Sequence, residues 1–291
     1  MTVASEHTLA CILIPVHNRK NTTLNCLHIL REQGVLERYK VIVIDDGSTD
    51  GTHESVRALS PLVDLITGDG NLWWTGAIRK GMEYAISQRA EWILWLNDDT
   101  TPAPGAIETL IAFCAQHSKV IAAANILDPK TWKASYGGVL TKGLKIKPAW
   151  PTDSKILFCE ALNGNLVCLP ASVVEAIGYP NDKTYPHYHG DTIYTHLAKQ
   201  KGYQLAIKPD AIAYCRNDHE KVSWLKSKYT IGEIIKERRN IKSPHYWKAH
   251  LAYYYTLLGI LGVGVYVYEV WIKLILIFLF KGLFPKRYSA S

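Results

Sequence analysis

The sequence predicts an α/β protein built on a mostly parallel β-sheet with helices on both faces. Two observations favour this class: short apolar runs recur along the first 170 residues, and segments with helical spacing separate them. Of the 291 residues, 48% are hydrophobic and only 20% are charged. That composition supplies a sizeable core and excludes a disordered chain.

The apolar runs are expected to form buried strands, because each is short and most are rich in β-branched residues. Runs that are apolar on both faces are typical of parallel strands lying between two layers of helices. The expected strands are residues 9–16, 39–44, 63–67, 91–96, 119–124 and 163–170.

The segments between these strands have helical spacing and carry helix start and stop signals. Asn21 or Thr22 is expected to cap the first helix, and Gly34 lies where a C-terminal cap belongs. Pro102 or Pro104 is expected to open the fourth helix. The expected helices are residues 24–33, 52–59, 76–89, 102–116, 171–178 and 191–203.

The domain organisation follows from where this pattern stops. Between residues 125 and 159 it loosens into Pro-, Gly- and Lys-rich sequence, but no clean linker follows. Residues 1–220 are therefore expected to form one domain and residues 221–291 a C-terminal helical tail. In the tail, residues 251–268 are uncharged but fall slightly short of the roughly 20 apolar residues of a spanning helix.

The rest of the tail is amphipathic and basic. Residues 269–280 carry only Glu269 and Lys273, spaced to pair on one helix face, which suits a helix in the membrane interface. We therefore expect the tail to associate with a membrane, by spanning it or by lying in its interface. A helical tail buried against the main domain is the alternative. Residues 221–248 are basic and include Lys226, Lys228, Lys236, Arg238, Arg239, Lys242 and Lys248.

Charge and cysteine content restrict the partners and the compartment. The formal charge of +7 suits an anionic partner, and from charge alone this is a phosphorylated small molecule, an acidic lipid surface or nucleic acid. The six cysteines form no C-x-x-C pair, which argues against a zinc site or disulfide framework and fits a reducing cytosol. The N-terminal residues do not have the pattern of a signal peptide.

Polar residues follow three of the expected strands, and ligands of open parallel sheets bind beyond the carboxyl ends of the strands. Adjacent carboxylates such as Asp98 and Asp99 repel each other, which indicates either a bound cation or a solvated helix cap. Mg²⁺ or Mn²⁺ takes one or two protein carboxylates and completes its shell with water and phosphate oxygens. The polar strand ends are residues 15–18, 45–48 and 97–99.

Several ordered motifs resemble family 2 glycosyltransferases of the GT-A fold, whose sheet is Rossmann-like. The resemblance covers about residues 9–215 and is strongest to bacterial enzymes that add sugars, rhamnose among them, to surface polysaccharides. It rests on ILIPVHNR, VIVIDDGSTDGT, NLWWTGAIRKGMEYA, WILWLNDDT, NGNLVCLP and HYHGDTIYTHLAKQKGY, in this order.

The resemblance implies roles for particular residues. Asp98 corresponds to the acid that binds the ribose, Asp99 to the one that binds Mg²⁺ or Mn²⁺, and Asp191 to the catalytic base. Asp46 corresponds to the residue that contacts the nucleotide base. The other positions implied to lie against the nucleotide are Pro15, Val16, His17, Asn18, Gly70, Asn71 and Arg79, with Trp73 and Trp74 beside them.

Some positions depart from the family pattern, and others have two possible roles. Gly190 replaces the glutamate that usually precedes the base, while Ile193 and Leu197 replace an acid and an arginine of many relatives. Cys215 lies near the place of a metal-binding histidine. His219 is a candidate substitute for that histidine, and His187 and His189 flank the proposed base. Trp73 and Trp74 either stack on a ligand or pack in the core.

The expected function is metal-assisted, inverting transfer of a sugar from a nucleoside diphosphate donor to a hydroxyl of a lipid-linked or cell-surface glycan. A hydroxyl is a weak nucleophile, so one carboxylate base is needed, and Asp191 at a helix start is suited to stay ionised. A plain helix cap is its alternative role. The expected location is the cytoplasmic face of the cell membrane, and no nucleic acid partner is expected.

Two rival functions are weighed against this one. A catalytically inactive GT-A-like scaffold protein at the membrane is favoured slightly by the loss of the glutamate at position 190. Retention of Asp46, Asp98, Asp99 and Asp191 weighs against it. A dinucleotide-dependent dehydrogenase is excluded because no G-x-G-x-x-G follows the first strand.

Overall fold

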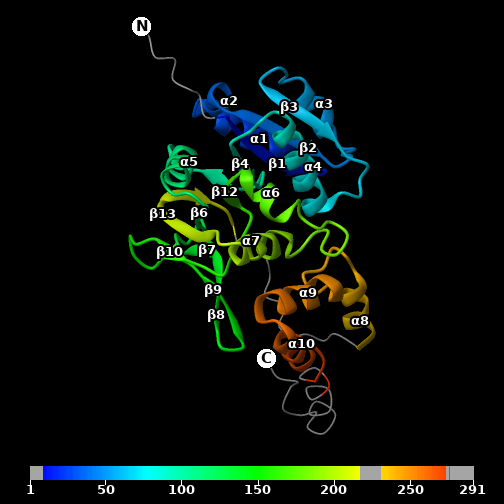
Figure 1. Ribbon diagram of the computed structural model, residues 1–291. Coiled ribbons are helices and arrows are strands. Elements are labelled where there is room, and N and C mark those ends of the chain that lie inside the picture. Colours follow the sequence, from blue (N-terminus) through cyan, green and yellow to red (C-terminus); the bar gives the residue numbers. More distant parts are fainter. Residues whose placement is uncertain (1–8, 217–230, 273–274, 276–291) are drawn as a thin grey trace.

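The computed structural model describes residues 9–216, 231–272 and 275. One large sheet has the strand order β10-β13-β6-β12-β4-β1-β2-β3, and a three-stranded sheet has the order β11-β8-β9 (Figure 1). The strands are β1 (Ala10–Val16), β2 (Lys40–Asp45), β3 (Val63–Thr67), β4 (Trp92–Leu96), β5 (Thr101–Pro102), β6 (Val120–Leu127), β7 (Ala134–Tyr136), β8 (Gly138–Lys142), β9 (Lys145–Ala149), β10 (Leu157–Phe158), β11 (Ala161–Leu162), β12 (Leu166–Pro170) and β13 (Gln204–Tyr214).

The large sheet is mixed, so the prediction of a mostly parallel sheet is confirmed only in part. Strands β4, β1, β2 and β3 pair in parallel, as expected for strands joined by helical crossovers. Strand β12, however, is antiparallel to both β4 and β6. The chain reaches β12 through the short strands β7 to β11 instead of a crossover helix, and it therefore enters the sheet from the opposite end.

Helices cover both faces of the sheet, as expected. The side chains of β1 alternate between two cores: Ile12 and Ile14 pack with α1 and α5, while Cys11 and Leu13 pack with α4 and α7. The helices are α1 (Lys20–Glu32), α2 (Val35–Arg38), α3 (Thr52–Arg57), α4 (Trp73–Ser87), α5 (Ala106–Gln116), α6 (Ser172–Ile177), α7 (Gly190–Gln200), α8 (Ile231–Arg239), α9 (Trp247–Leu258) and α10 (Ile260–Val267), followed by a π-helical turn (Tyr268–Ile272).

Two predicted helix starts are wrong for tertiary reasons. Helix α1 begins at Lys20, before Asn21 and Thr22, and the Lys20 amide donates to the carboxylate of Asp50 at 3.0 Å. A side chain from a distant loop thus takes the place of a local cap. Helix α5 begins at Ala106, after both expected openers: Pro102 belongs to β5, which pairs with β13, and Pro104 precedes the helix.

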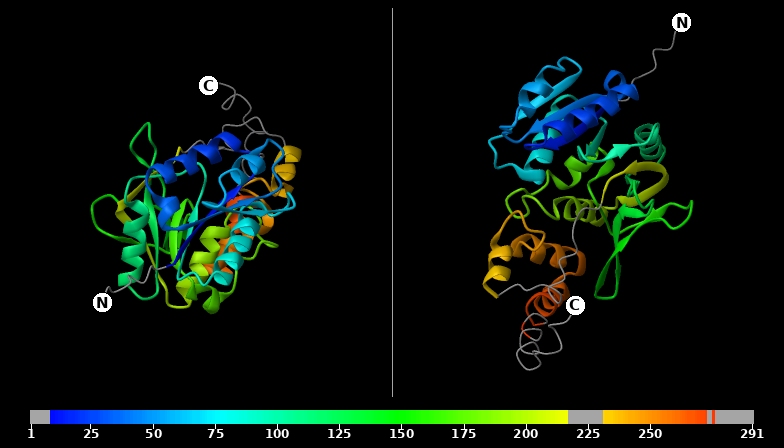
Figure 2. Two further views of the ribbon diagram at one scale, coloured as in Figure 1. Left: turned by 90° about the horizontal axis from the view of Figure 1, so that it is seen from above. Right: turned by 180° about the vertical axis from the view of Figure 1, so that it is seen from behind.

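The described part of the C-terminal tail packs on the main domain. Ala249 of α9 is buried against Tyr185 and Ile193, the latter on α7, so α9 follows the alternative interpretation of the tail (Figure 2). Gly259, with φ of +64°, divides the uncharged stretch 251–268 into α9 and α10. None of the helices described is both long and apolar enough to cross a membrane. Two expected features, the domain boundary at residue 220 and Lys273 as partner of Glu269, lie outside the described residues.

A charge at Ala249 is expected to detach α9. Substituting Ala249→Glu places a carboxylate in this apolar contact and should lower the free energy of unfolding by about 2 kcal/mol or more. Thermal and urea unfolding measure the loss. Tyr255→Glu, on an exposed position of the same helix, is the matched control and should change stability little. Equal losses in both variants would contradict the packing described here.

Candidate functional site

A cavity of about 750 Å³ lies at the carboxyl ends of β1, β2 and β4. Parallel strands of an open α/β sheet present their ligand sites at this edge. The predicted site residues that line the cavity are Pro15, Val16, His17, Asp46, Gly70, Asp98, Asp99 and Asp191. Most of the residues predicted to lie near the nucleotide, the metal or the acceptor are therefore brought together in one cavity.

Three predicted nucleotide contacts are absent from the lining. Arg79 instead pairs with Glu83 at 3.0 Å and with Asp182 at 3.1 Å. Asn71 is exposed and its amide donates to Asp69. Asn18 accepts from the Thr49 amide at 2.7 Å, so it joins two turns of the cavity rim.

The turns that follow β1 and β2 form one hydrogen-bonded unit. The Asn18 amide donates to the Ser48 hydroxyl at 2.8 Å, and Nδ1 of His17 lies 2.6 Å from the Asp46 carbonyl oxygen. Asn18 has φ of +52°, a backbone conformation that asparagine tolerates better than most residues. The rim of the cavity is therefore held in place by bonds between its own segments.

Asp46 organises the wall that precedes α4. Its two carboxylate oxygens accept from the amides of Gly70 at 2.8 Å and Trp73 at 2.9 Å, and the residue is almost fully buried. Gly47 must be glycine, because a Cβ atom there would lie 2.9 Å from the Gly70 nitrogen and φ is +66°. The proposed contact of Asp46 with the nucleotide base stays a prediction, beside this structural role.

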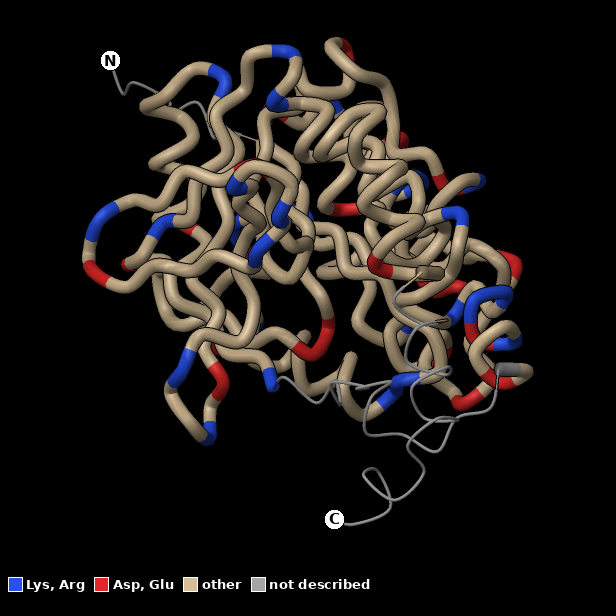
Figure 3. Tube along the Cα trace, turned by 90° about the horizontal axis from the view of Figure 1, so that it is seen from below, with Lys and Arg blue, Asp and Glu red and all other residues tan. Residues whose placement is uncertain are grey.

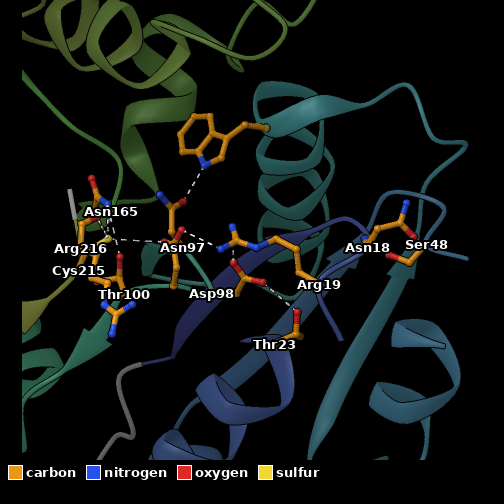
Figure 4. A network of polar contacts seen from close by, with 12 residues as sticks. Asn18, Arg19, Thr23, Ser48, Asn97, Asp98, Thr100, Asn165, Cys215 and Arg216 are labelled. Carbon is orange, nitrogen blue, oxygen red and sulfur yellow. Dashed lines mark hydrogen bonds and ion pairs between the residues drawn. The ribbon is translucent and has the colours of Figure 1, made fainter. Parts of the chain in front are cut away.

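Arg19 bridges the two aspartates at the end of β4, and the sequence reasoning missed it (Figure 4). Its guanidinium lies 3.0 Å from Asp98 and 2.9 Å from Asp99. The Thr23 hydroxyl donates to the second oxygen of Asp98 at 2.9 Å. One cation thus offsets the repulsion between the adjacent carboxylates. Its signal in the sequence was its place at the end of the HNR segment.

The two aspartates differ in environment. Asp98 is buried, and burial raises its pKa to about 6 against the opposing influence of Arg19 and the Thr23 hydroxyl. Asp99 keeps 40% of its side chain exposed and faces the cavity. Asp99 is therefore the more accessible of the two carboxylates for a cation that arrives with a ligand.

Cys215, which the family resemblance places near a metal-binding histidine of some relatives, lies beside Asp99. Its Sγ atom is 3.8 Å from an Asp99 oxygen. Burial raises the pKa of the thiol to about 12, so the thiolate form that binds metals is strongly disfavoured. The candidate substitute, His219, lies outside the described residues.

The residues present fit a metal that shares its ligands with a diphosphate. Within residues 9–216 and 231–272, no group of three or more His, Cys, Asp or Glu side chains could hold a cation alone. An accessible carboxylate beside a second one is nevertheless the donor set from which Mg²⁺ or Mn²⁺ completes its shell with phosphate and water. The cavity therefore suits a cation whose coordination shell is completed by the phosphates of a bound substrate.

Asp191 lines the same cavity and is held by backbone amides. Its oxygens accept from the amides of Gly164 and Thr192, both at 2.7 Å. Burial raises the pKa of the carboxyl, and these two bonds only partly oppose the rise. The alternative role as a helix cap is wrong, because His189 holds the N-cap position of α7.

Gly190 has a packing explanation. A Cβ atom at this position would collide with Oγ1 of Thr75 on α4. Thr75 is fixed there, since its amide donates to the Pro186 carbonyl and its hydroxyl to the Tyr185 carbonyl. The missing glutamate therefore reflects the close approach of α4 to the start of α7.

The two tryptophans of α4 behave differently. Trp74 donates to the Asn97 side chain at 2.8 Å and packs edge-on against Trp95 at 5.6 Å, which ties it to the core. Trp73 lies against His187 at 5.8 Å, and the Lys242 ammonium lies 5.3 Å from its ring centre. Both tryptophans also line the cavity.

Residues from late in the chain complete the lining. Lys242, in the connection between α8 and α9, reaches the cavity although the sequence indicated only membrane attraction for this basic segment. His189 lies stacked on Tyr253 of α9 at 4.3 Å, and burial lowers its pKa to about 4. Other lining residues that the sequence reasoning missed are Tyr136, Asn163 and Asn165. Tyr136 lies in the loosely patterned segment 125–159, whereas Asn163 and Asn165 lie in the motif NGNLVCLP, to which no site role was assigned.

A Rossmann-like α/β sheet with acidic strand ends around one cavity is the architecture of a GT-A-type glycosyltransferase domain. Residues 11–147 match the family model described as Glycosyl transferase family 2. The family resemblance read from the sequence motifs is thereby confirmed.

A relative with a known name is galactofuranosyltransferase GlfT1 of Mycobacterium tuberculosis (strain CDC 1551 / Oshkosh). It is 27% identical over 201 residues, which cover 63% of this chain and 62% of the relative. The matching part therefore spans less than two thirds of that relative's length.

Solved structures share the fold at low identity. The mannosyltransferase PcManGT from Pyrobaculum calidifontis, in complex with GDP-Man and Mn²⁺, has a TM-score of 0.54 and 16% identity, covering 99% of this chain and 84% of its own. GalNAc-T7 with UDP, GalNAc and Mn²⁺ has a TM-score of 0.58 and 15% identity, covering 73% and 44%. TarS 1-349 of S. aureus has a TM-score of 0.55 and 11% identity, covering 91% and 73%.

Removal of Arg19 is expected to make the fold responsive to a divalent cation. Arg19→Ala leaves the buried Asp98 with only Thr23 as its partner and should cost about 1–2 kcal/mol of stability, a discounted figure because the arginine is partly exposed. Mn²⁺ supplied together with a nucleoside diphosphate should raise the melting temperature of this variant more than that of the parent.

The control for this experiment is Arg38→Ala, which removes an arginine that pairs with Glu108 away from the cavity. That variant should lose stability without any recovery in Mn²⁺. Recovery of both variants, or of neither, would contradict a cation site at Asp98 and Asp99.

Proposed function

We propose that the protein transfers a sugar, with inversion, from a nucleoside diphosphate donor to a hydroxyl of a lipid-linked or cell-surface glycan. One observation carries this proposal: the strand-end turns, the two aspartates of β4 and Asp191 line a single cavity. A donor bound at the strand ends would therefore share the cavity with the carboxylate of Asp191.

The donor is proposed to lie along the turns after β1 and β2. Pro15, Val16, His17 and the Gly70 segment would contact the nucleotide, with Asp98 at the ribose. Asp99 would hold Mg²⁺ or Mn²⁺, which supplies positive charge to the leaving diphosphate when it is bound. Displacement of Arg19 from Asp99 would free its guanidinium to bind a phosphate oxygen.

The catalytic base is proposed to be Asp191. The acceptor oxygen attacks the anomeric carbon, the bond to the diphosphate oxygen breaks, and the hydroxyl proton passes to the carboxylate. Burial makes this carboxylate a stronger base than an exposed aspartate. The amides of Gly164 and Thr192 fix its orientation.

The membrane proposal rests on the surface of the C-terminal helices. Ile260, Leu261 and Tyr268 expose 77%, 63% and 53% of their surface, an unusual density of exposed apolar groups. Basic residues precede them in the sequence. We propose that residues 221–291 hold the protein at the cytoplasmic face of the cell membrane.

An inactive scaffold protein remains the second candidate, since Gly190 replaces the usual glutamate. However, a side chain at position 190 would collide with Thr75, and this steric requirement explains the glycine without reference to activity. Turnover of a nucleotide sugar excludes the scaffold, and tight membrane binding without turnover of any donor would favour it.

A donor screen tests the proposed function. The relatives' names suggest a galactofuranosyl donor, UDP-GalNAc and GDP-mannose, and the sequence resemblance adds dTDP-rhamnose. The true donor should raise the melting temperature with Mn²⁺ present, since a ligand of the folded state stabilises it by mass action. Asp99→Ala should abolish this cation-dependent rise, whereas Asp210→Ala, which removes an acid that pairs with Lys208 outside the cavity lining, should retain it. A donor-dependent rise that persists in Asp99→Ala would contradict the assigned role.

The role of Asp191 is tested by separating binding from chemistry. Asp191→Asn should lower the transfer rate by about 10²–10⁴-fold while donor stabilisation persists, because it removes the proton acceptor together with one of the two amide bonds that orient the side chain. In the parent protein the rate should fall as the pH drops through the pKa of Asp191. Since that pKa is raised, this acidic limb should lie above the range of an exposed aspartate. An unchanged rate in Asp191→Asn would refute the assignment.

A further inference from the structure

We infer that the β8–β9 hairpin is a second membrane contact, which docks on anionic lipid headgroups beside the C-terminal helices. The inference deepens the membrane association proposed above and rests on it. It adds the partner's chemistry, the residues that recognise it and the orientation of the cavity relative to the bilayer.

The hairpin presents a cluster of lysines on one face. Leu140 pairs with Lys147 and Lys142 pairs with Lys145 across the two strands. Side chains of directly paired residues, and of every second residue along a strand, share a face of the sheet. Lys142, Lys145 and Lys147 therefore lie together, and all three are exposed.

This cluster is unfavourable in the isolated protein. Like charges directly opposite each other in an antiparallel pair are destabilising. None of the three lysines forms an ion pair with any acid in the described ranges 9–216 and 231–272. From residue 130 to residue 158 the chain has six lysines and a single acid, Asp153. An anionic surface would offset the repulsion.

Apolar side chains accompany the charges. Leu144 at the hairpin tip is 50% exposed, and Trp150 just beyond β9 is 41% exposed. Aliphatic and aromatic groups among lysines are typical of segments that insert shallowly into the interface of an anionic bilayer. A soluble anionic ligand would give no reason for an exposed leucine at the tip.

The hairpin and the C-terminal helices project from the same side of the protein. Figure 1 and the rear view of Figure 2 show β8–β9 and α10 both extending below the large sheet. Figure 3 looks at this side and shows lysine and arginine positions, a group of them near the middle of the view. A planar surface can therefore touch the hairpin tip and α10 together.

Residues next to each of these two contacts line the cavity. Tyr136 and Asn163 line the cavity and flank the three-stranded sheet, with the Asn163 amide donating to the Gly137 carbonyl. Lys242 lines it from the other side and leads into α9. Docking at both contacts would hold the cavity close to the bilayer, where a lipid-linked acceptor resides.

Vesicle binding by the full chain tests the inference. Binding is measured by co-sedimentation with vesicles of phosphatidylcholine, with and without phosphatidylglycerol. Substituting Lys142→Gln, Lys145→Gln and Lys147→Gln together should weaken binding to the anionic vesicles by about tenfold or more. The same substitutions should leave the residual binding to neutral vesicles unchanged.

The matched control removes the same charge elsewhere. Lys80→Gln, Lys119→Gln and Lys201→Gln change exposed lysines outside the hairpin and the C-terminal helices. This triple variant should bind nearly as tightly as the parent. Equal weakening in the two triple variants, or none in the hairpin variant, would overturn the inference. Melting temperature and circular dichroism verify that both variants are folded.

Two further measurements separate this inference from the proposed function. An environment-sensitive fluorophore on Leu144→Cys should shift to the blue and be quenched by brominated lipids, whereas one on Lys201→Cys should not. No response at either position would overturn the inference. Turnover of the donor with a soluble acceptor should be the same in the hairpin variant and the parent. If the hairpin variant loses vesicle binding but keeps full turnover, the lysines act in docking and not in catalysis. If the parent binds vesicles but turns over no donor, the proposed function is contradicted while the docking inference stands.

Discussion

The repulsion between two neighbouring carboxylates at the end of β4 sets the constraint on which the rest of the site depends. Asp98 is buried, Asp99 faces the cavity, and Arg19 offsets both charges. Arg19 stands between β1 and α1, so this contact ties the end of one central strand to the end of its neighbour. The same geometry keeps the more exposed carboxylate accessible from the cavity.

The other two acids of the cavity, Asp46 and Asp191, are held by backbone amides instead of by an arginine. Asp46 holds the segment before α4 through Gly70 and Trp73, and Asp191 is held by amides on both of its oxygens. Charged groups bound by fixed amides need little rearrangement when a ligand arrives. The tail takes part in this arrangement, because Lys242 lines the cavity and α9 packs on α7.

The accuracy of the predictions differed between elements for physical reasons. Strands β1 to β4 were predicted to within a residue because continuous apolar runs rich in β-branched residues carry a strong local signal. Strands β7 to β11 were missed because they are short and include exposed, lysine-rich positions. The reversed direction of β12 could not be read locally, since strand direction depends on the route of the connection.

The sequence by itself determined the alternation of buried strands and helices, the polar strand ends and the family of the N-terminal part. Each of these is written in neighbouring residues. Only the tertiary structure decided that Arg19 pairs with an acid 80 positions away, that Lys242 reaches the cavity and that Gly190 leaves room for Thr75. These contacts join residues far apart in the chain, so packing between elements creates them and no local pattern encodes them.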